Sequence, residues 1–445
     1  MKRVAVLNVV GLTRSVLEEM PRLRKWAEGK ELSNFRPAFP AVTCTAQSSY
    51  LTGKPVGEHG IVGNGWYDRE AAEVKFWKQS NHLVKGEKVW EAAGVDCSKM
   101  FWWYNMYSSA HFSATPRPLY PADGRKFFDI HTQPMAMREE MKADLGPFPF
   151  PAFWGPKAGI GSSEWIAASA KWIEEKESPT LNLVYLPHLD YGLQKFGPGA
   201  PEMDVEYEAI DEVTCDLIEF LEGRDVKVLV LSEYGISKVS KVIHLNRIFR
   251  EKGWIQVKDE LGLETLDCGG CQAFAVADHQ VAHVYVNDPA IAQELREVVL
   301  AVDGVQEIRE GADLWGEGIG RDRGGDFVAV SEADAWFTYY YWTDDSKAPD
   351  FARCIDIHRK PGYDPVELFL DPEIKFPLLK IVGFLAKKKL GFRGLMDVIP
   401  LDASLVKGSH GRDDVPAEEQ PVAIGARAAE VDSAEAVFDW IRRSF

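Results

Sequence analysis

Three short apolar runs, far apart along the chain, constrain its fold more than any other feature. They are Val4–Val10, Thr180–Leu186 and Val226–Leu231. Runs of this length without polar alternation are typical of parallel strands that are covered on both faces. Stretches with helical spacing, such as Pro201–Leu221, separate them. We therefore predict an α/β fold in which a doubly wound, mostly parallel sheet is sandwiched by helices.

The pattern changes between residues 255 and 345, where short strand-like runs lie close together. We expect strands at Phe274–Val276, Val281–Val286 and Phe327–Val330, with a helix at Ala290–Leu300. This segment is interpreted as a small α+β cap inserted into the core. The core then comprises residues 1–254 and 346–445, and a chain of 445 residues is long enough for both parts.

Polar side chains follow two of the apolar runs directly. His188 and Asp190 come after the second run, and Glu233 comes after the third. Ligands of open α/β sheets bind where the carboxyl ends of the strands meet. These side chains are therefore candidates for binding a metal ion or a substrate.

The segment from Pro37 to Tyr67 is the strongest candidate for chemistry. A β-type run ends in Thr43, a turn of small residues starts a helix, and Asn64 lies between two glycines. A hydroxyl at the start of a helix meets unpaired N–H groups, which favour a bound anion. The alternative is that Thr43 only caps the helix and that Asn64 supplies a positive φ in a turn.

The order of these parts resembles the type I phosphodiesterase and nucleotide pyrophosphatase branch of the alkaline phosphatase superfamily. The matching pieces are Pro40-Ala-Val-Thr43, Leu51-Thr52-Gly53 and His59-Gly60-Ile61-Val62-Gly63-Asn64. The resemblance implies that Thr43 is the nucleophile and that Asn64 donates to a phosphoryl oxygen. It also implies a metal-dependent hydrolase or transferase that acts on a phosphate ester, a phosphodiester or a phosphonate.

The resembled family holds two metal ions with carboxylates and histidines at strand ends. Matched by motif order, Asp190 and His410 are kept, and Glu233 replaces an aspartate. His358 and His188 are candidates for additional ligands. Carboxylate and imidazole ligands suit Zn²⁺, with Mn²⁺ or Fe²⁺ as alternatives. We expect one ion rather than the usual pair.

Three positions depart from the family's ligand set. Val10, Gln194 and Tyr234 stand where the family has an aspartate and two histidines. Two other outcomes therefore stay open: anion binding at Thr43 and Asn64 without a metal, and a catalytically altered binding or accessory protein that retains the fold and the anion pocket.

An aromatic cluster at residues 101–107 is a candidate wall for the organic part of a substrate. Trp103, Tyr104 and Asn105 lie at its centre, and an irregular loop at residues 116–125 offers Arg125 to an anion. Packing in the core is the alternative for such a cluster. The same surplus of aromatic residues would suit the face of a homodimer.

Charge and cysteine content limit the partners and the location. The net charge is −17 and no basic stripe is present, which argues against nucleic acid but allows a small anionic substrate. The six cysteines are scattered and form no disulfide framework. The sequence contains no run of about 20 apolar residues, so we expect no transmembrane segment and a cytoplasmic location.

Two further segments contain side chains that could bind a metal ion or a membrane. His279 and His283 are four residues apart, which on a strand places them about 13 Å from each other. This spacing argues against a shared metal and leaves one of them for the edge of a cleft. Residues 376–393 are both apolar and basic. A peripheral membrane contact is one interpretation, but we favour a helix packed on the protein with its lysines in solvent.

Overall fold

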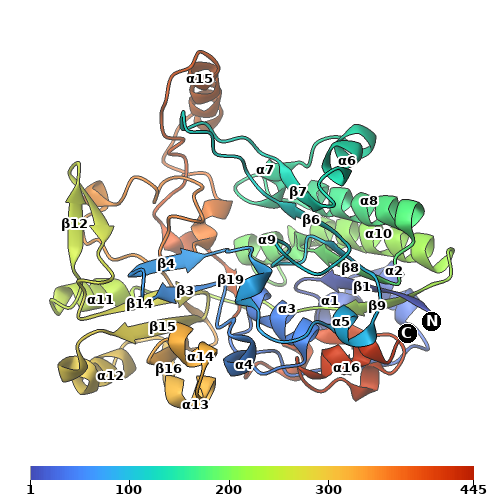
Figure 1. The fold of residues 1–445 in the computed structure, drawn as a ribbon. Helices are drawn as coiled ribbons and strands as arrows, with labels where there is room; N and C mark the ends of the chain where they lie inside the picture. The colour runs from blue at the N-terminus through green and yellow to red at the C-terminus, as the bar shows by residue number, and fades with distance from the viewer. Residues whose placement is uncertain (1) are drawn as a thin grey trace.

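A central sheet of eight strands organises the computed structural model, which describes residues 2–445 (Figure 1). Across the sheet the strands are β2 (Leu32–Asn34), β20 (Val422–Ile424), β9 (Val226–Leu231), β1 (Arg3–Val9), β8 (Leu181–Leu186), β5 (Cys97–Met100), β6 (Phe112–Pro116) and β7 (Ile130–Gln133). The five strands from β9 to β6 pair in parallel, and the outer strands pair antiparallel. The predicted α/β class with a mostly parallel sheet is confirmed.

Strand β1 is the middle of this parallel set. Val4 pairs with Leu181 of β8, and Ala5 pairs with Val228 of β9. From Val4 to Val9 every residue of the strand is buried. A strand that is covered on both faces must be apolar at consecutive positions, which is the pattern that predicted it.

Helices cover both faces of the sheet. The long helices α8 (Ile160–Glu177) and α10 (Met203–Glu222) pack together against β8 and β9 (Figure 1). On the opposite face lie α3 (Thr43–Thr52), α5 (Val89–Ala93) and α16 (Ala436–Arg442), with α16 in contact with the other two. Helix α3 is buried over its whole length, which fixes its first residue at the carboxyl edge of the sheet.

A second sheet of four antiparallel strands has its own hydrophobic cluster. Its order is β14 (Ala273–Asp278), β15 (Val281–Val286), β17 (Phe327–Ser331) and β16 (Val305–Glu310), with α12 (Ala292–Leu300) packed on β16. The cluster also draws on Tyr67, Phe249 and Val406. The boundaries 255 and 345 therefore stay a prediction for this cap.

The remaining elements are short. The other helices are α1 (Arg14–Glu18), α2 (Pro21–Ala27), α4 (Val56–His59), α6 (Met137–Leu145), α7 (Phe150–Phe153), α9 (His188–Phe196), α11 (Leu245–Glu251), α13 (Gly311–Trp315), α14 (Ile319–Arg323) and α15 (Pro377–Lys389). The other strands form the pairs β3 (Gly65–Asp68) with β4 (Glu73–Phe76), β10 (Ser237–Lys238) with β19 (Gly408–Ser409), β11 (Lys241–Ile243) with β18 (Ala335–Phe337), and β12 (Val257–Glu260) with β13 (Leu263–Leu266).

Helix α15 projects from the body of the molecule (Figure 1). None of its residues is buried. Ile381 packs at the edge of the second hydrophobic cluster, but most apolar side chains of α15 are exposed. The predicted packing of this helix on the protein therefore holds for one contact and not for the rest of its apolar surface. Between Lys2 and Phe445, no helix combines the length and the apolar character needed to cross a bilayer.

The burial of β1 leads to a prediction about stability. Leu7 is fully buried in β1, whereas Leu261 is fully exposed in the β12–β13 turn. Leu7→Ala should lower the free energy of unfolding by about 2–5 kcal/mol, because it leaves a cavity between packed layers. Leu261→Ala, the matched control, should change it by less than about 0.5 kcal/mol. Urea unfolding measures both values, and equal values for the two variants would contradict this packing.

Candidate functional site

The predicted nucleophile lies where the carboxyl ends of the parallel strands meet. Helix α3 begins at Thr43, and the Thr43 Oγ1 atom is 2.9 Å from the hydroxyl oxygen of Tyr234, just after β9. The Tyr234 hydroxyl also donates to Oδ1 of Asp190, in α9 after β8, at 3.4 Å. His410 Nε2 lies 3.7 Å from the same Asp190 oxygen. The structure thus brings Thr43, Asp190 and His410 together, with Tyr234 between Thr43 and Asp190.

The start of α3 differs from two expectations drawn from the sequence: a β-type run that ends in Thr43, and Thr43 as the cap of the helix. Residues 37–42 are irregular rather than a strand, since Pro37 and Pro40 have no N–H to donate to a ladder. Val42 is the N-cap residue and makes no side-chain cap hydrogen bond, so Thr43 is the first helical residue and not the cap. Its hydroxyl is therefore available for Tyr234.

Four rings form a column beside Thr43, here called the ring stack, in the order Tyr234, His410, His279 and Tyr363; the two outer pairs are stacked, and the two histidine rings are tilted by 36° to each other. The ring centroids of neighbouring members are 3.6, 3.7 and 3.6 Å apart. His279 comes from the turn between β14 and β15, so the second sheet contributes to the stack. The Tyr363 hydroxyl donates to Oε1 of Gln194 at 2.9 Å, which ties the far end of the stack to α9.

Both histidines of the stack are neutral. Burial lowers the pKa of His410 and of His279 well below the usual range. His410 Nδ1 donates to the carbonyl of Ala41 at 2.7 Å, which leaves Nε2 without a proton and without a hydrogen-bond partner. His279 Nδ1 donates to Asp278 Oδ1 at 2.9 Å. The two neutral imidazole rings therefore pack against their neighbours, and His410 Nε2 remains able to accept a hydrogen bond.

Glu233 is fully buried and held by two amides. Its Oε1 atom accepts from Asn8 Nδ2 at 2.6 Å and from Gln47 Nε2 at 2.7 Å, while Oε2 has no hydrogen-bond partner. Burial raises the pKa of Glu233 to about 8 and, in the same way, that of Asp190 to about 7. At neutral pH a large share of both side chains is protonated, so this edge of the sheet carries less negative charge than its sequence indicates.

Asn64 is anchored at both ends of its amide. Its Oδ1 accepts from the backbone N–H of Cys44 at 3.1 Å, and Nδ2 donates to Asp278 Oδ1 at 3.0 Å. The backbone N–H of Asn64 donates to the other Asp278 oxygen. Its φ is not positive, so it does not act as the turn residue of the simpler interpretation. One hydrogen of Nδ2 remains for an anion beside α3.

The aromatic segment at residues 101–107 is mostly buried, and one member is linked to the site. The backbone N–H of Trp103 donates to Oε1 of Gln47, whose amide nitrogen holds Glu233. Tyr104 is buried in a cluster with Cys44. Asn105 donates to the carbonyls of Ala114 and Lys99 and so supports the backbone.

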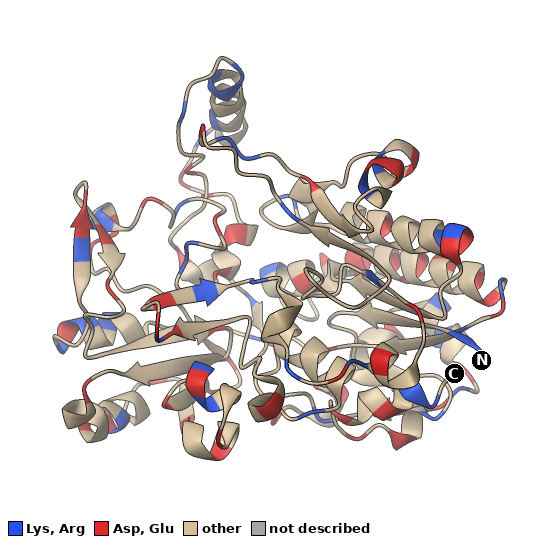
Figure 2. Ribbon diagram, viewed as in Figure 1, with Lys and Arg blue, Asp and Glu red and all other residues tan. Residues whose placement is uncertain are grey.

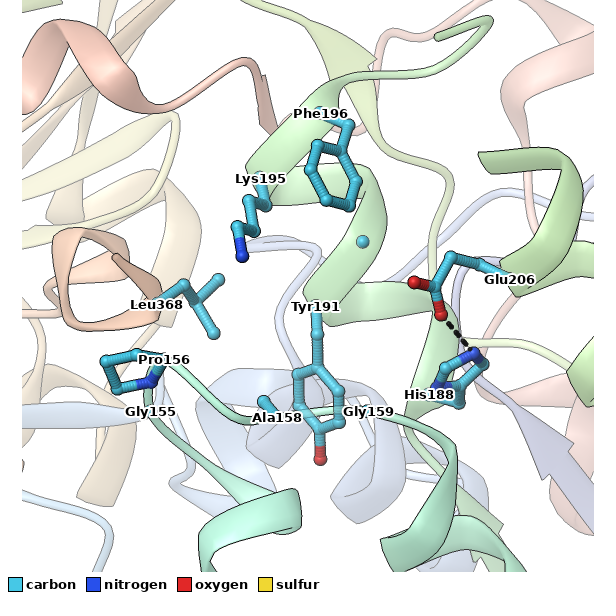
Figure 3. A pocket seen from close by; sticks show the side chains of 11 residues that line it. Gly155, Pro156, Ala158, Gly159, His188, Tyr191, Lys195, Phe196, Glu206 and Leu368 are labelled. Carbon is cyan, nitrogen blue, oxygen red and sulfur yellow. Dashed lines mark ion pairs between the residues drawn. The ribbon is translucent and has the colours of Figure 1, made fainter. Parts of the chain in front are cut away.

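Three predicted site residues have other partners. Arg125 is an exposed side chain that pairs with Asp123 at 2.7 Å. His358 Nδ1 lies 3.4 Å from the carbonyl oxygen of Phe76. His188 Nε2 lies 2.7 Å from Glu206 Oε2, at a cavity of about 50 Å³ on the outer side of α9 (Figure 3). None of the contacts in the described part of the chain joins these three side chains to Thr43.

Other side chains at the site were not singled out from the sequence. They are Asn8, Gln47, Asp278 and Tyr363. The sequence indicates Tyr234 only as a replaced metal ligand, and its contact with Thr43 could not be read from the sequence. The sequence leaves either His279 or His283 for the edge of a cleft, and His279 is the one that lies within the stack. His283 instead stacks on Trp315, with centroids 5.6 Å apart. The sequence signal for the second sheet's contribution is the pair Asp278-His279, at the end of strand β14.

The side chains present do not fit the resembled family's pair of metal ions. Val10 has no ligand atom, Gln194 Oε1 accepts from Tyr363, and the Tyr234 hydroxyl lies between the Thr43 and Asp190 oxygens. Among residues 2–445, no three His, Cys, Asp or Glu side chains form a group that could hold a metal ion. Asp190 and His410 are the two expected ligands that face each other.

Comparisons with known proteins agree with this fold. A family model described as Type I phosphodiesterase / nucleotide pyrophosphatase matches residues 4–364. An uncharacterized pyrophosphatase/phosphodiesterase of Schizosaccharomyces pombe is 27% identical over 228 residues, or 48% of this chain and 40% of the relative. The match thus spans about two-fifths of the length of that curated relative.

Solved structures of low sequence identity share the fold. An inactive form of murine ectonucleotide pyrophosphatase/phosphodiesterase 5 in complex with AMP is 14% identical, with a TM-score of 0.60 over 100% of this chain and 94% of that chain. Phosphonoacetate hydrolase from Sinorhizobium meliloti 1021 in complex with phosphonoformate is 15% identical, with a TM-score of 0.60 over 99% and 96% of the two chains.

The support beneath the aromatic segment leads to a prediction about pH. Lys99 Nζ is buried and donates to the carbonyl of Trp103 at 3.0 Å, and burial lowers its pKa to about 7. Between pH 7 and 10.5 the unfolded chain binds this proton and the folded chain does not, so stability should rise with pH over that range. The rise should be about 1.4 kcal/mol per unit of pKa shift.

Lys99→Met should remove this contribution to the pH dependence and leave the dependence below pH 7 unchanged. Urea unfolding at a series of pH values from 6 to 10.5 measures the slope. A parallel series on Lys25→Met, at an exposed position of α2, controls for the loss of one lysine. The same slope in wild type and in Lys99→Met would show that the buried amine keeps its usual pKa.

Proposed function

Because this chain belongs to the type I phosphodiesterase/nucleotide pyrophosphatase family, we propose that it is a hydrolase, or a transferase, in which the Thr43 hydroxyl attacks phosphorus. The substrate class is a phosphate ester, a phosphodiester or a phosphonate. One observation carries the proposal: Thr43, at the position that matches the family's nucleophile, is connected through Tyr234 to the carboxylate of Asp190.

This connection supplies a path for the proton of the nucleophile. The pKa of the Tyr234 hydroxyl is raised well above its usual value by burial, so the hydroxyl stays protonated. It accepts the Thr43 proton as its own proton passes to Asp190, while Thr43 Oγ1 forms the bond to phosphorus and the leaving group departs with its electron pair. A carboxylate with a pKa of about 7 suits a general base at neutral pH. Water then releases the phosphoryl group from Thr43.

The developing charge on the phosphoryl oxygens has two sources of support. The N-terminus of α3, a helix of 10 residues, presents its N–H groups and the positive end of its dipole beside Thr43. Asn64 contributes the free hydrogen of Nδ2 as a donor. Donors that are fixed before the reaction stabilise charge without reorganisation.

The role of a metal is a separate part of the proposal. The family is generally dependent on divalent metal, and we retain the prediction of one ion, Zn²⁺ with Mn²⁺ or Fe²⁺ as alternatives. Of its predicted ligands Asp190, His410 and Glu233, the first two face each other, whereas Glu233 is held by Asn8 and Gln47. The facing pair of Asp190 and His410 supports two of these ligands. No step of the proton path above depends on the ion.

A catalytically altered binding protein is the second candidate. The observation that favours it is the replacement of three ligand positions by Val10, Gln194 and Tyr234, together with the depth of the site. Thr43 is 4% exposed and Asp190 is 8% exposed, so a substrate must displace part of the ring stack or enter from the Asp190 side. Such a binding protein would still hold an anion at the N-terminus of α3 but would not turn over a substrate.

We also propose a cytoplasmic location. All six cysteines lie in the described part of the chain and are free, which suits a reducing compartment. A homodimer stays a prediction that sedimentation velocity tests.

Substitutions at the proton path test the hydrolase. Thr43→Ala should lower kcat/KM for bis(p-nitrophenyl) phosphate or p-nitrophenyl phosphate at least about 1,000-fold, because the attacking oxygen is removed. Thr43→Ser should keep activity within about tenfold. Tyr234→Phe should lower kcat about 100- to 10,000-fold with little change in KM, since the proton path is interrupted.

Thr52→Ala is the matched control, because Thr52 ends the same helix and its hydroxyl bonds only backbone groups, donating to the Ser48 carbonyl and accepting from the Lys54 N–H. This variant should behave as wild type. Turnover that is equal in wild type, Thr43→Ala and Tyr234→Phe would refute the proposed nucleophile. If wild type shows no turnover but binds AMP or inorganic phosphate in a way that Asn64→Ala weakens, the second candidate replaces the first.

Metal content tests the ligand set. Wild type should hold about one transition metal per chain by plasma mass spectrometry, and His410→Ala should lose it. The combined variant Val10→Asp, Gln194→His and Tyr234→His restores the family's donors and should bind about one ion more than wild type. Two stoichiometric ions in wild type would contradict the description of the site.

A further inference from the structure

Large exposed apolar side chains are concentrated at one projecting tip of the molecule. Of the 17 large hydrophobic residues that are exposed in the described chain, 12 lie within residues 117–128 and 376–395. We call these two segments the α15 tip. The 12 exposed apolar residues of the tip are Leu119, Tyr120, Phe127, Phe128, Phe376, Leu378, Leu379, Val382, Leu385, Leu390, Phe392 and Leu395. Monomeric proteins rarely expose so much apolar surface in one place without a partner.

The two segments of the tip touch each other. Lys388 Nζ donates to the carbonyl of Lys126 at 3.4 Å, and the Arg393 side chain lies against Gly124. The first segment folds back on itself through a bridge between Leu119 and Phe127. Figure 1 shows the loop beyond β6 beside α15, away from both sheets.

The tip is also strongly basic. Residues 117–128 and 376–395 contain eight Lys or Arg residues and one acidic residue, Asp123, whereas the whole chain has a net charge of −17. Lys387, Lys388 and Lys389 form the last turn of α15. Figure 2 shows these basic residues on and beside the projecting helix. The positive charge therefore coincides with the exposed apolar side chains.

We propose that the α15 tip is a docking surface for an anionic lipid bilayer. Apolar side chains that project from a convex tip suit the acyl boundary of a bilayer, whereas a protein partner would need a groove to receive them. The flanking Lys and Arg side chains reach past the apolar layer to the headgroups. Apolar insertion together with a polybasic cluster supplies the two signals that stable peripheral binding requires.

The charge distribution selects anionic rather than neutral lipid. Each Lys or Arg near an anionic surface strengthens binding, and the acidic remainder of the chain is repelled by the same surface. The tip therefore sets the orientation, because it is the only strongly basic apolar projection among residues 2–445. The proposal is independent of the chemistry at Thr43, and a chain without turnover would still bind.

Vesicle co-sedimentation with the full chain tests the proposal. Wild type should bind vesicles of phosphatidylcholine with 30% phosphatidylserine, and it should bind pure phosphatidylcholine vesicles at least about tenfold more weakly. Binding should fall at 0.5 M salt, where charges are screened over a few ångström. Lys387→Glu, Lys388→Glu and Lys389→Glu together should lower the partition coefficient at least about 100-fold.

The matched control carries the same change of charge elsewhere: Lys25→Glu, Lys157→Glu and Lys347→Glu, at exposed positions outside the tip. It should reduce binding much less than the tip variant. A second tip variant, Leu378→Ser with Leu379→Ser, tests apolar insertion, and Leu300→Ser is its control on α12. Circular dichroism and thermal unfolding show whether each variant keeps the fold.

Two results would overturn the proposal. One is that wild type does not bind anionic vesicles, or binds them no more tightly than the lysine and leucine tip variants do. The other is a dimer in sedimentation velocity that the leucine tip variant dissociates, with no vesicle binding by the wild type. That result would assign the tip to a second copy of this chain.

Discussion

The parallel pairing of β1 between β8 and β9 is the constraint on which the rest of the structure depends. Because all three strands run in one direction, the residues that follow them emerge at the same edge of the sheet. Tyr234 and Asp190 meet there although they are 44 positions apart. Helix α3, buried along its length, brings Thr43 to the same edge. A register shift in either pairing would separate the hydroxyl from the carboxylate.

What occupies this edge differs from a site built for two ions. Four aromatic rings and two carboxyl groups with raised pKa values fill the space with mostly uncharged groups. Burying an unpaired charge is costly, and a protonated carboxyl held by amides avoids that cost. Tyr234 is the central change, since its ring packs on His410 while its hydroxyl connects Thr43 to Asp190. One side chain thus takes both the packing and the polar role at this point.

The sequence indicated the sheet well because a doubly covered strand must be apolar at consecutive positions, as in Val4–Val10. Thr43 and Asn64 could be proposed as candidate site residues for a different reason: the motif that contains them is local in the sequence. Asn8 and Gln47 could not, since a polar residue inside a buried element has no pattern of its own. His279 reaches the site from another sheet, and α15 is exposed although it is apolar. Both facts depend on contacts far apart in sequence, which local patterns do not contain.

The ring stack has a consequence for how the chain acquires its site. Tyr234 can be in place as soon as β9 has joined the central sheet, but His279 arrives with the second sheet and His410 comes from within the last tenth of the chain. Closing such long loops is slow, so assembly of the stack belongs to the final stage of folding. On a ribosome, the emerging chain would hold an incomplete ring stack until almost all of it had been synthesised.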